Sequence, residues 1–141
     1  MSYEYSEDAL IEQATEDVLK ELGWKVVTAW QNESFGEHGL LGRDNKTEVV
    51  LERYLLAALK RLNPDLPELA YSRAIEKLVQ HEADKTIAQQ NKTKYQFLKN
   101  GVEVSFVNAE GKSQKKTLKI LDFKEYHNND FLAVRQLEVS G

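Results

Sequence analysis

Glu12, near the start of the chain, is a candidate for a residue that binds a metal ion or a water molecule. Glu12 lies eleven residues before Gly23, and Trp24 and the strand-like stretch 25–27 follow directly. A carboxylate placed in this way can bind a metal ion or orient a water molecule. The apolar residues of 10–22, however, predict a buried helical stripe, and Glu12 projects about 120° from the centre of that stripe. An exposed helical glutamate without a function therefore stays open as the alternative.

The tripeptide Glu110-Gly111-Lys112 is the one Glu-x-Lys sequence in the chain. Nuclease sites of the PD-(D/E)xK type place this pair on one face of a strand. An upstream aspartate completes the site, so that two carboxylates hold Mg²⁺ and the lysine assists the attacking water. Here the pair straddles a glycine between two strand-like segments. A mobile turn holds a metal ion poorly, so we predict a hairpin turn and no metal site.

Lysines gather around this turn. Between residues 85 and 119 the chain has eight lysines and two glutamates, although its net charge is −4 and its pI is about 5.5. Such a cluster either forms a solvated face of the hairpin or contacts the phosphates of DNA. Both interpretations stay open, and the candidate DNA contacts are Lys112, Lys115, Lys116 and Lys119.

Several other chemistries are excluded or find no support. The chain has no cysteine, which excludes disulfides, thiolate zinc sites and cysteine nucleophiles. His38, His81 and His127 lie in separate segments without a metal-ligand spacing, so we interpret them as loop or surface residues. The stretch GEHGLLG, residues 36–42, lacks the Gly-Lys-Ser/Thr ending of a phosphate-binding loop and predicts a flexible loop.

The composition is that of a globular protein. The 141 residues are enough for one domain, and 41% of them are hydrophobic and 30% charged. No apolar run approaches the length of a membrane span, and the first ten residues lack the basic flank and apolar stretch of a signal peptide. We expect a cytoplasmic protein with no membrane partner.

Along the chain, the sequence predicts mostly helices in the first two thirds and mostly strands in the last third. Helical spacing of apolar residues predicts helices at 7–22, 48–62, 67–80 and about 85–99, with Ser6 and Thr47 as N-caps and Pro67 in the first turn of the third. Runs rich in β-branched and apolar residues predict strands at 24–30, 102–108, 115–123 and 131–139, and the second and third form a hairpin. The expected fold class is α/β, with a partial mixed or antiparallel sheet.

The closing strand is the element least able to stand alone. Residues 131–134 are apolar without a break, which is typical of a strand covered on both faces, and Leu137 and Val139 continue one face by alternation. An uncovered apolar edge is a template for aggregation. We therefore expect this strand to need neighbours that residues 1–141 do not supply, and the isolated chain to be marginally stable or to self-associate.

Four segments, taken in order, resemble one family. They are SEDALIEQATEDVLKELGW (6–24), FGEHGLLGRDNKTEVVLERYLLAALKRLNPDLP (35–67), KYQFLKNGVEVSF (94–106) and NNDFLAVRQLEVSG (128–141). They are similar to the N-terminus of the R subunit, the motor and nuclease, of type I restriction–modification enzymes. In that family the sequence continues into a Pro-Asp motif, a strand Glu-x-Lys motif and an ATP-driven DNA translocase. We therefore expect residues 1–141 to be the N-terminal part of the endonuclease domain, ending before the Pro-Asp and Glu-x-Lys motifs.

The resemblance implies a restriction-endonuclease-like PD-(D/E)xK fold and a specific parent activity. That activity is cleavage of double-stranded DNA with Mg²⁺, coupled to ATP-dependent translocation, in a complex with methyltransferase and specificity subunits. Glu12 matches the first-helix glutamate that positions metal or water in the superfamily, and it is the one functional residue that carries over. We expect residues 1–141 alone to bind no cofactor and to be inactive. The rival interpretations are a non-catalytic module that contacts DNA or another subunit through residues 85–119, and, less favoured, a complete small protein.

Overall fold

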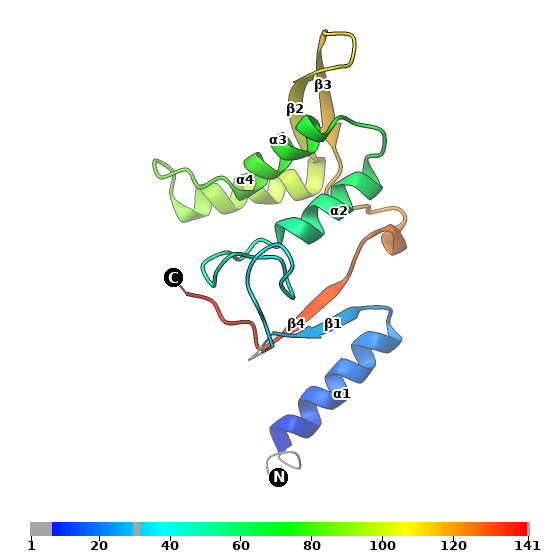
Figure 1. Ribbon diagram of the computed structural model, residues 1–141, viewed down its shortest axis with the longest axis vertical. Helices are drawn as coiled ribbons and strands as arrows, with labels where there is room; N and C mark the ends of the chain where they lie inside the picture. Colours follow the sequence, from blue (N-terminus) through cyan, green and yellow to red (C-terminus); the bar gives the residue numbers. More distant parts are fainter. Residues whose placement is uncertain (1–6, 30–31, 141) are drawn as a thin grey trace. The chain divides into compact units, whose positions relative to one another are not determined.

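The computed structural model describes residues 7–29 and 32–140 and shows an α/β chain. The chain divides into two compact units, unit 1 (Met1–Val49 and Asp130–Gly141) and unit 2 (Val50–Asn129). Figure 1 labels the elements. The helices are α1 (Glu7–Glu21), α2 (Glu52–Leu62), α3 (Glu68–Val79), α4 (Ile87–Asn100) and the short 3₁₀ helix η2 (Tyr126–Asn128). The strands are β1 (Lys25–Thr28), β2 (Val102–Val107), β3 (Ser113–Leu118) and β4 (Leu132–Arg135).

Unit 1 is built on a parallel pair of strands. β1 pairs with β4 in a register that sets Lys25 opposite Leu132 and Thr28 opposite Arg135. We expected the closing strand to need neighbours that residues 1–141 do not supply, but β1 supplies one of them, so that expectation was wrong for one edge of β4. The residues of β4 are all half-buried, so they are also less covered than the unbroken apolar run predicts. An apolar pattern fixes which residues face inward but not which strand lies beside them.

The first helix runs into β1 through a glycine. Gly23 has a φ of 89°, a left-handed conformation that glycine adopts without steric cost, and it ends α1 where the sequence predicts. Beyond it, the rings of Trp24 and Phe131 pack with centroids 5.1 Å apart. This contact joins the entry of β1 to the entry of β4. The predicted N-cap, Ser6, lies outside the described residues.

The segment between β1 and α2 is irregular but anchored. Arg43 is 2% exposed, and its guanidinium donates to both carboxylate oxygens of Glu33 at 2.6 and 2.7 Å. It also donates to the carbonyl oxygens of Glu48, at 3.2 Å, and Glu138, at 2.7 Å. Leu41 beside it is fully buried. We predicted a flexible loop; the segment is a loop, but Arg43 ties it to itself and to the residues after β4.

The second helix begins later than predicted. Its N-cap is Leu51, without a side-chain hydrogen bond, whereas we expected Thr47 to cap a helix from residue 48. Thr47 is occupied elsewhere, since its hydroxyl and its backbone N–H both donate to the side-chain oxygen of Asn45. Local side-chain hydrogen bonds of this kind compete with helix formation. The third and fourth helices lie close to their predicted bounds.

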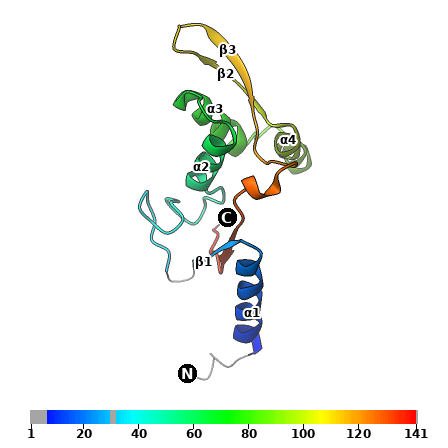
Figure 2. The same cartoon turned by 90° about the vertical axis from the view of Figure 1, so that its right-hand side faces the viewer.

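Unit 2 packs α2 and α3 on one face of the hairpin. β2 and β3 are antiparallel, and Val102, Val104 and Phe106 alternate inward along β2. They share a buried core with apolar side chains of α2, α3 and β3, namely Leu59, Ala70, Tyr71, Ala74 and Leu118. Figure 2 shows α3 beside the hairpin, whose far end extends beyond the helices. The hairpin tip is therefore presented to solvent.

Glu110, Gly111 and Lys112 lie in the turn of the hairpin. Asn108 accepts two backbone N–H groups on its side-chain oxygen, those of Glu110 and Lys112, each at 3.0 Å. Gly111 has a φ of 79°, and both Glu110 and Lys112 are exposed. The predicted turn is confirmed. β3 ends at Leu118 instead of continuing to residue 123. The next residue, Lys119, pairs with a side chain and not with a strand: its backbone N–H donates to the side-chain oxygen of Asn63 at 2.8 Å, and its carbonyl oxygen accepts from the side-chain amide of Asn63 at 2.9 Å.

Removing Arg43 is expected to unfold unit 1 before unit 2. Arg43→Met leaves Glu33 buried without a partner, which costs about 3–5 kcal/mol. Both tryptophans of the chain, at 24 and 30, belong to the sequence of unit 1, so tryptophan fluorescence in urea measures this unit. The control is Lys46→Met, which removes an exposed ion pair with Glu138 and is expected to cost about 1 kcal/mol or less. If Arg43→Met unfolds at the same urea concentration as Lys46→Met, the prediction is contradicted.

The same ion pair makes unit 1 sensitive to acid. Hydrogen bonds from Arg43 lower the pKa of Glu33, against the opposing effect of burial. A carboxyl of this kind stabilises the fold above its ordinary pKa of about 4.3, and the stabilisation is lost as the pH falls through the lowered value. We expect the urea midpoint by tryptophan fluorescence to drop between about pH 5 and about pH 3. In Glu33→Gln the urea midpoint should decrease less over this pH range. If it decreases as steeply as in the wild type, other carboxylates cause the acid sensitivity.

Candidate functional site

A charged cluster joins the first helix to the last strand of unit 1. Glu12 and Glu16 lie one turn apart on α1, and Arg135 is the last residue of β4. The guanidinium of Arg135 donates to Glu12 at 2.5 Å and to Glu16 at 2.6 Å. Glu16 also accepts an ion pair from Lys20 at 2.7 Å. The parallel register of β1 and β4 brings Arg135 to this place, because α1 leads directly into β1.

This cluster reverses the expected orientation of α1. We predicted that the apolar stripe of residues 10–22 is buried, and for Glu12 we left both a functional and a merely exposed helical glutamate open. In the structure Leu10, Ile11, Val18 and Leu22 are 54–69% exposed, while the side chain of Glu16 is 14% exposed. The prediction of a buried stripe was wrong. The face of α1 that meets β4 instead carries Glu12 and Glu16, which both bind Arg135.

A hollow of about 300 Å³ opens beside the cluster. Its polar lining comes from Glu12, Thr15, Glu16, Arg135 and Gln136. Its apolar lining includes Leu19 and side chains of the two strands. The side chain of Glu12 stays 42% exposed despite its bond to Arg135. A carboxylate that is oriented by a neighbour and still accessible is a group that can contact a ligand in the hollow.

The charges of the cluster support one another. The pKa of Glu16 is lowered by hydrogen bonds from Lys20 and Arg135, and the pKa of Arg135 is raised by its bonds to Glu12 and Glu16. Glu16 and Arg135 therefore both stay ionised at neutral pH. The chemistry that these residues can perform is orientation of a carboxylate, because a paired guanidinium neither gives up nor accepts a proton.

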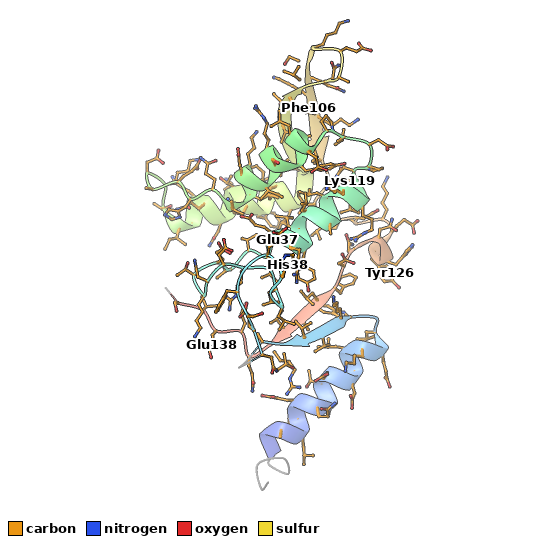
Figure 3. The ribbon with its side chains drawn as sticks, viewed as in Figure 1. Glu37, His38, Phe106, Lys119, Tyr126 and Glu138 are labelled. Atoms are coloured by element: carbon orange, nitrogen blue, oxygen red, sulfur yellow. The ribbon has the colours of Figure 1, made fainter. Side chains whose placement is uncertain are left out.

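The cluster does not by itself fit a metal ion. Mg²⁺ prefers several oxygen ligands, and the two carboxylates here both bind a guanidinium that would repel a cation. In residues 7–29 and 32–140 no group of three or more His, Cys, Asp or Glu side chains is placed to hold a metal. The histidines do not change this: His38, His81 and His127 are exposed, as predicted, and Figure 3 shows His38 in the loop of unit 1.

Sequence analysis missed two members of the cluster and one feature of its backbone. Nothing local marks Glu16 or Arg135, since their contact spans 119 positions of sequence. Gln136 has a φ of 54°, and it lines the hollow. A non-glycine residue in this left-handed region carries strain, and such residues cluster at functional sites.

The comparisons with known proteins identify the family. Residues 4–141 match the family described as Type I restriction enzyme R protein N terminus. The chain belongs to this family. The resemblance read from the four sequence segments is thereby confirmed, and the cluster of Glu12, Glu16 and Arg135 is a feature of a type I R protein N-terminal region.

Two relatives of this R protein N-terminal region have longer chains. One is the "Type I restriction enzyme HindI endonuclease subunit" of Haemophilus influenzae, which is 30% identical over 129 residues, 92% of this chain and 12% of that protein. The other, from Methanocaldococcus jannaschii, has the provisional name of a type I restriction enzyme MjaIXP endonuclease subunit and is 27% identical over 139 residues, 95% of this chain and 12% of that protein. No solved structure gave a significant match.

The four candidate DNA contacts of the R protein N-terminal region do not share one face. Lys115 lies opposite Ser105 and Lys116 lies opposite Val104, so the two lysines project to opposite sides of the hairpin. Lys112 is in the turn, and Figure 3 shows Lys119 where β3 ends. All four are exposed.

None of the helices in the described ranges has the length and apolar content to cross a membrane.

Relieving the strain at Gln136 is expected to stabilise unit 1. A left-handed backbone costs an ordinary residue about 1–2 kcal/mol, and part of the gain from glycine is lost to the freedom of the unfolded chain. Gln136→Gly should therefore raise the free energy of unfolding by about 0.5–1 kcal/mol in urea titrations followed by tryptophan fluorescence. The matched control is Gln136→Ala, which shortens the side chain and keeps the strain. If both variants shift stability equally, the backbone at residue 136 is not strained.

Proposed function

We propose that this chain is the N-terminal part of the nuclease region of a type I restriction enzyme R subunit. In this proposal the whole subunit cleaves double-stranded DNA with Mg²⁺, coupled to ATP-dependent translocation, and works with methyltransferase and specificity subunits. The observation that carries the proposal is the family match over residues 4–141, supported by two relatives named as endonuclease subunits. The order of α1, β1 and a later parallel strand supports a PD-(D/E)xK nuclease fold.

Within this proposal Glu12 is the catalytic residue of the described chain. Its carboxylate lies at the hollow beside β4, it is oriented by Arg135, and it remains partly accessible. Glu16 is paired with two cations and is more deeply buried, which favours a structural role. Because the cluster lacks the further carboxylates that a metal needs, we expect residues 1–141 alone to show no Mg²⁺-dependent cleavage.

A second candidate function is a non-catalytic module that contacts DNA or another subunit. The observation in its favour is the exposure of the hairpin lysines and of the apolar stripe on α1. In this alternative the bond between Glu12 and Arg135 does no more than hold α1 on β4. The two functions therefore differ in what they predict for substitutions at Glu12.

Substituting Glu12 should separate cleavage from ATP hydrolysis. In a complete R subunit that contains this sequence, Glu12→Ala is expected to reduce DNA cleavage by about 10- to 100-fold, the range found for groups that orient metal ligands. ATP hydrolysis should stay at the wild-type rate, because the motor is a separate part of the subunit. Parallel cleavage and ATPase assays measure both. The matched control is Glu21→Ala, since Glu21 is an exposed glutamate on the same helix.

Arg135→Met distinguishes a catalytic from an anchoring role for Glu12. If Glu12 only anchors α1, Glu12→Ala and Arg135→Met lower cleavage and thermal stability together. If Glu12 acts on the reaction, Glu12→Gln keeps an acceptor for Arg135, retains the melting temperature and still lowers cleavage. If Glu12→Ala cleaves DNA at the wild-type rate, Glu12 is not catalytic, and the non-catalytic binding module becomes the better supported function.

The hairpin lysines should bind DNA through its backbone. Duplex DNA of arbitrary sequence is expected to bind weakly, with an affinity that falls steeply as salt rises, because phosphate contacts release counterions. Replacing Lys112, Lys115, Lys116 and Lys119 with Gln should weaken binding and flatten the salt dependence. Fluorescence anisotropy at several salt concentrations measures both effects. If this fourfold variant binds DNA as tightly as the wild type, the lysines form a solvated face of the hairpin and do not contact DNA.

A further inference from the structure

Unit 2 exposes a group of apolar and aromatic side chains away from the hairpin lysine turn. Tyr95 and Leu98 from α4 and Leu121 and Phe123 from the chain after β3 line an open hollow of about 510 Å³ together with Lys99. Tyr95 is 59% exposed and Phe123 70% exposed. We call these five residues the Tyr95 surface. Apolar side chains that are exposed as one contiguous group mark interaction sites more often than scattered ones do.

The Tyr95 surface is edged by positive charge. Leu98, Lys99, Leu121 and Phe123 also line an adjoining hollow, and that hollow adds Lys119 and Lys124. Within the described part of the chain, the ammonium groups of Lys99 and Lys124 have no hydrogen-bond or ion-pair partner, and Lys119 interacts with the charge of Asp122 without a hydrogen bond to it. Lys99 and Lys124 are therefore available to a ligand.

The one carboxylate at this edge is occupied by its own loop. Asp122 accepts hydrogen bonds from the backbone N–H groups of Lys124 and Glu125, at 3.0 and 2.9 Å, and from the side chain of Asn128 at 3.1 Å. These bonds lower the pKa of Asp122 to about 2. Asp122 therefore stays ionised, but its oxygens are directed at the turn that it organises. The charge left facing the Tyr95 surface is that of the lysines.

Accessible rings beside unpaired lysines fit a ligand with flat apolar faces joined by anionic links. A single strand of nucleic acid has this chemistry, because its bases can stack on aromatic rings while its phosphates meet the lysines. A duplex does not, since the faces of its bases are covered by their neighbours. We propose that the Tyr95 surface binds single-stranded DNA through stacking on Tyr95 and Phe123. This inference rests on the proposed function, which makes DNA the ligand, and adds a second contact to it.

The test compares stacking with charge on the same probe. A fluorescein-labelled oligothymidylate of about 12 nucleotides is long enough for a site of this kind. By fluorescence anisotropy, Tyr95→Ala and Phe123→Ala are each expected to weaken its binding about 10-fold without changing the salt dependence. Tyr95→Phe keeps the ring and should bind within about twofold of wild type. Lys99→Gln with Lys124→Gln should instead flatten the salt dependence.

Duplex DNA separates this inference from the hairpin hypothesis. Tyr95→Ala should leave the affinity for a matched duplex unchanged, whereas the fourfold hairpin variant should lower it. Unaltered oligothymidylate binding by both Tyr95→Ala and Phe123→Ala overturns the inference, whatever the hairpin lysines do. Far-UV circular dichroism melts verify that each variant is folded, and Tyr95→Leu replaces Tyr95→Ala if alanine disturbs α4.

Two further outcomes also overturn the inference. Tighter binding of an oligouridylate than of the oligothymidylate assigns the surface to RNA. A concentration-dependent dimer in sedimentation velocity that Tyr95→Ala abolishes assigns it to a second copy of the chain. Ring-dependent binding by a monomer, with DNA bound at least as tightly as RNA, supports the inference.

Discussion

The parallel pairing of β1 with β4 is the contact on which the rest of unit 1 depends. Two parallel strands cannot be joined by a tight turn, so the chain between them must form a long crossover. Here that crossover contains the whole of unit 2 and the loop that Arg43 anchors. The pairing also fixes the position of Arg135 relative to α1, because α1 enters β1 directly. A shift of one residue in the register would turn Arg135 to the other face and break the candidate site.

Two arginines hold unit 1 together in different ways. Arg43 is buried with Glu33, so their charges have lost water and depend on each other, and removing one leaves the other unpaired. Arg135 is partly exposed and shares its guanidinium between Glu12 and Glu16. The first arrangement favours rigidity. The second leaves a carboxylate oriented but accessible, which is the property a functional group needs. This difference in burial is why we assign structure to one arginine and function to the partner of the other.

Elements with strong local signals follow the sequence, and elements with distant partners do not. Thr86 and Gly101 begin and end α4 with a capping box and a left-handed residue, both visible as residue types. The Asn108–Lys112 turn is likewise local. The side of α1 that faces the protein was mispredicted because its apolar stripe is conspicuous and its ion pair with Arg135 is 123 positions away. The partner of β4 was missed for the same reason, and Thr47 failed as a cap because Asn45 competes for it.

The distance along the chain between β1 and β4 also orders events during synthesis. Lys25 and Leu132 are neighbours in the register but are made roughly a hundred residues apart, so at ribosomal rates β1 waits about 5–20 s for its partner. The hairpin and helices of unit 2 have nearby partners and can form in that interval. Until Arg135 emerges, the inner edge of β1 lacks its partner strand and Glu12 on α1 lacks its guanidinium, while Glu16 has only Lys20. The nascent chain therefore passes through a stage in which its first two elements are exposed to chaperones, proteases and other strands.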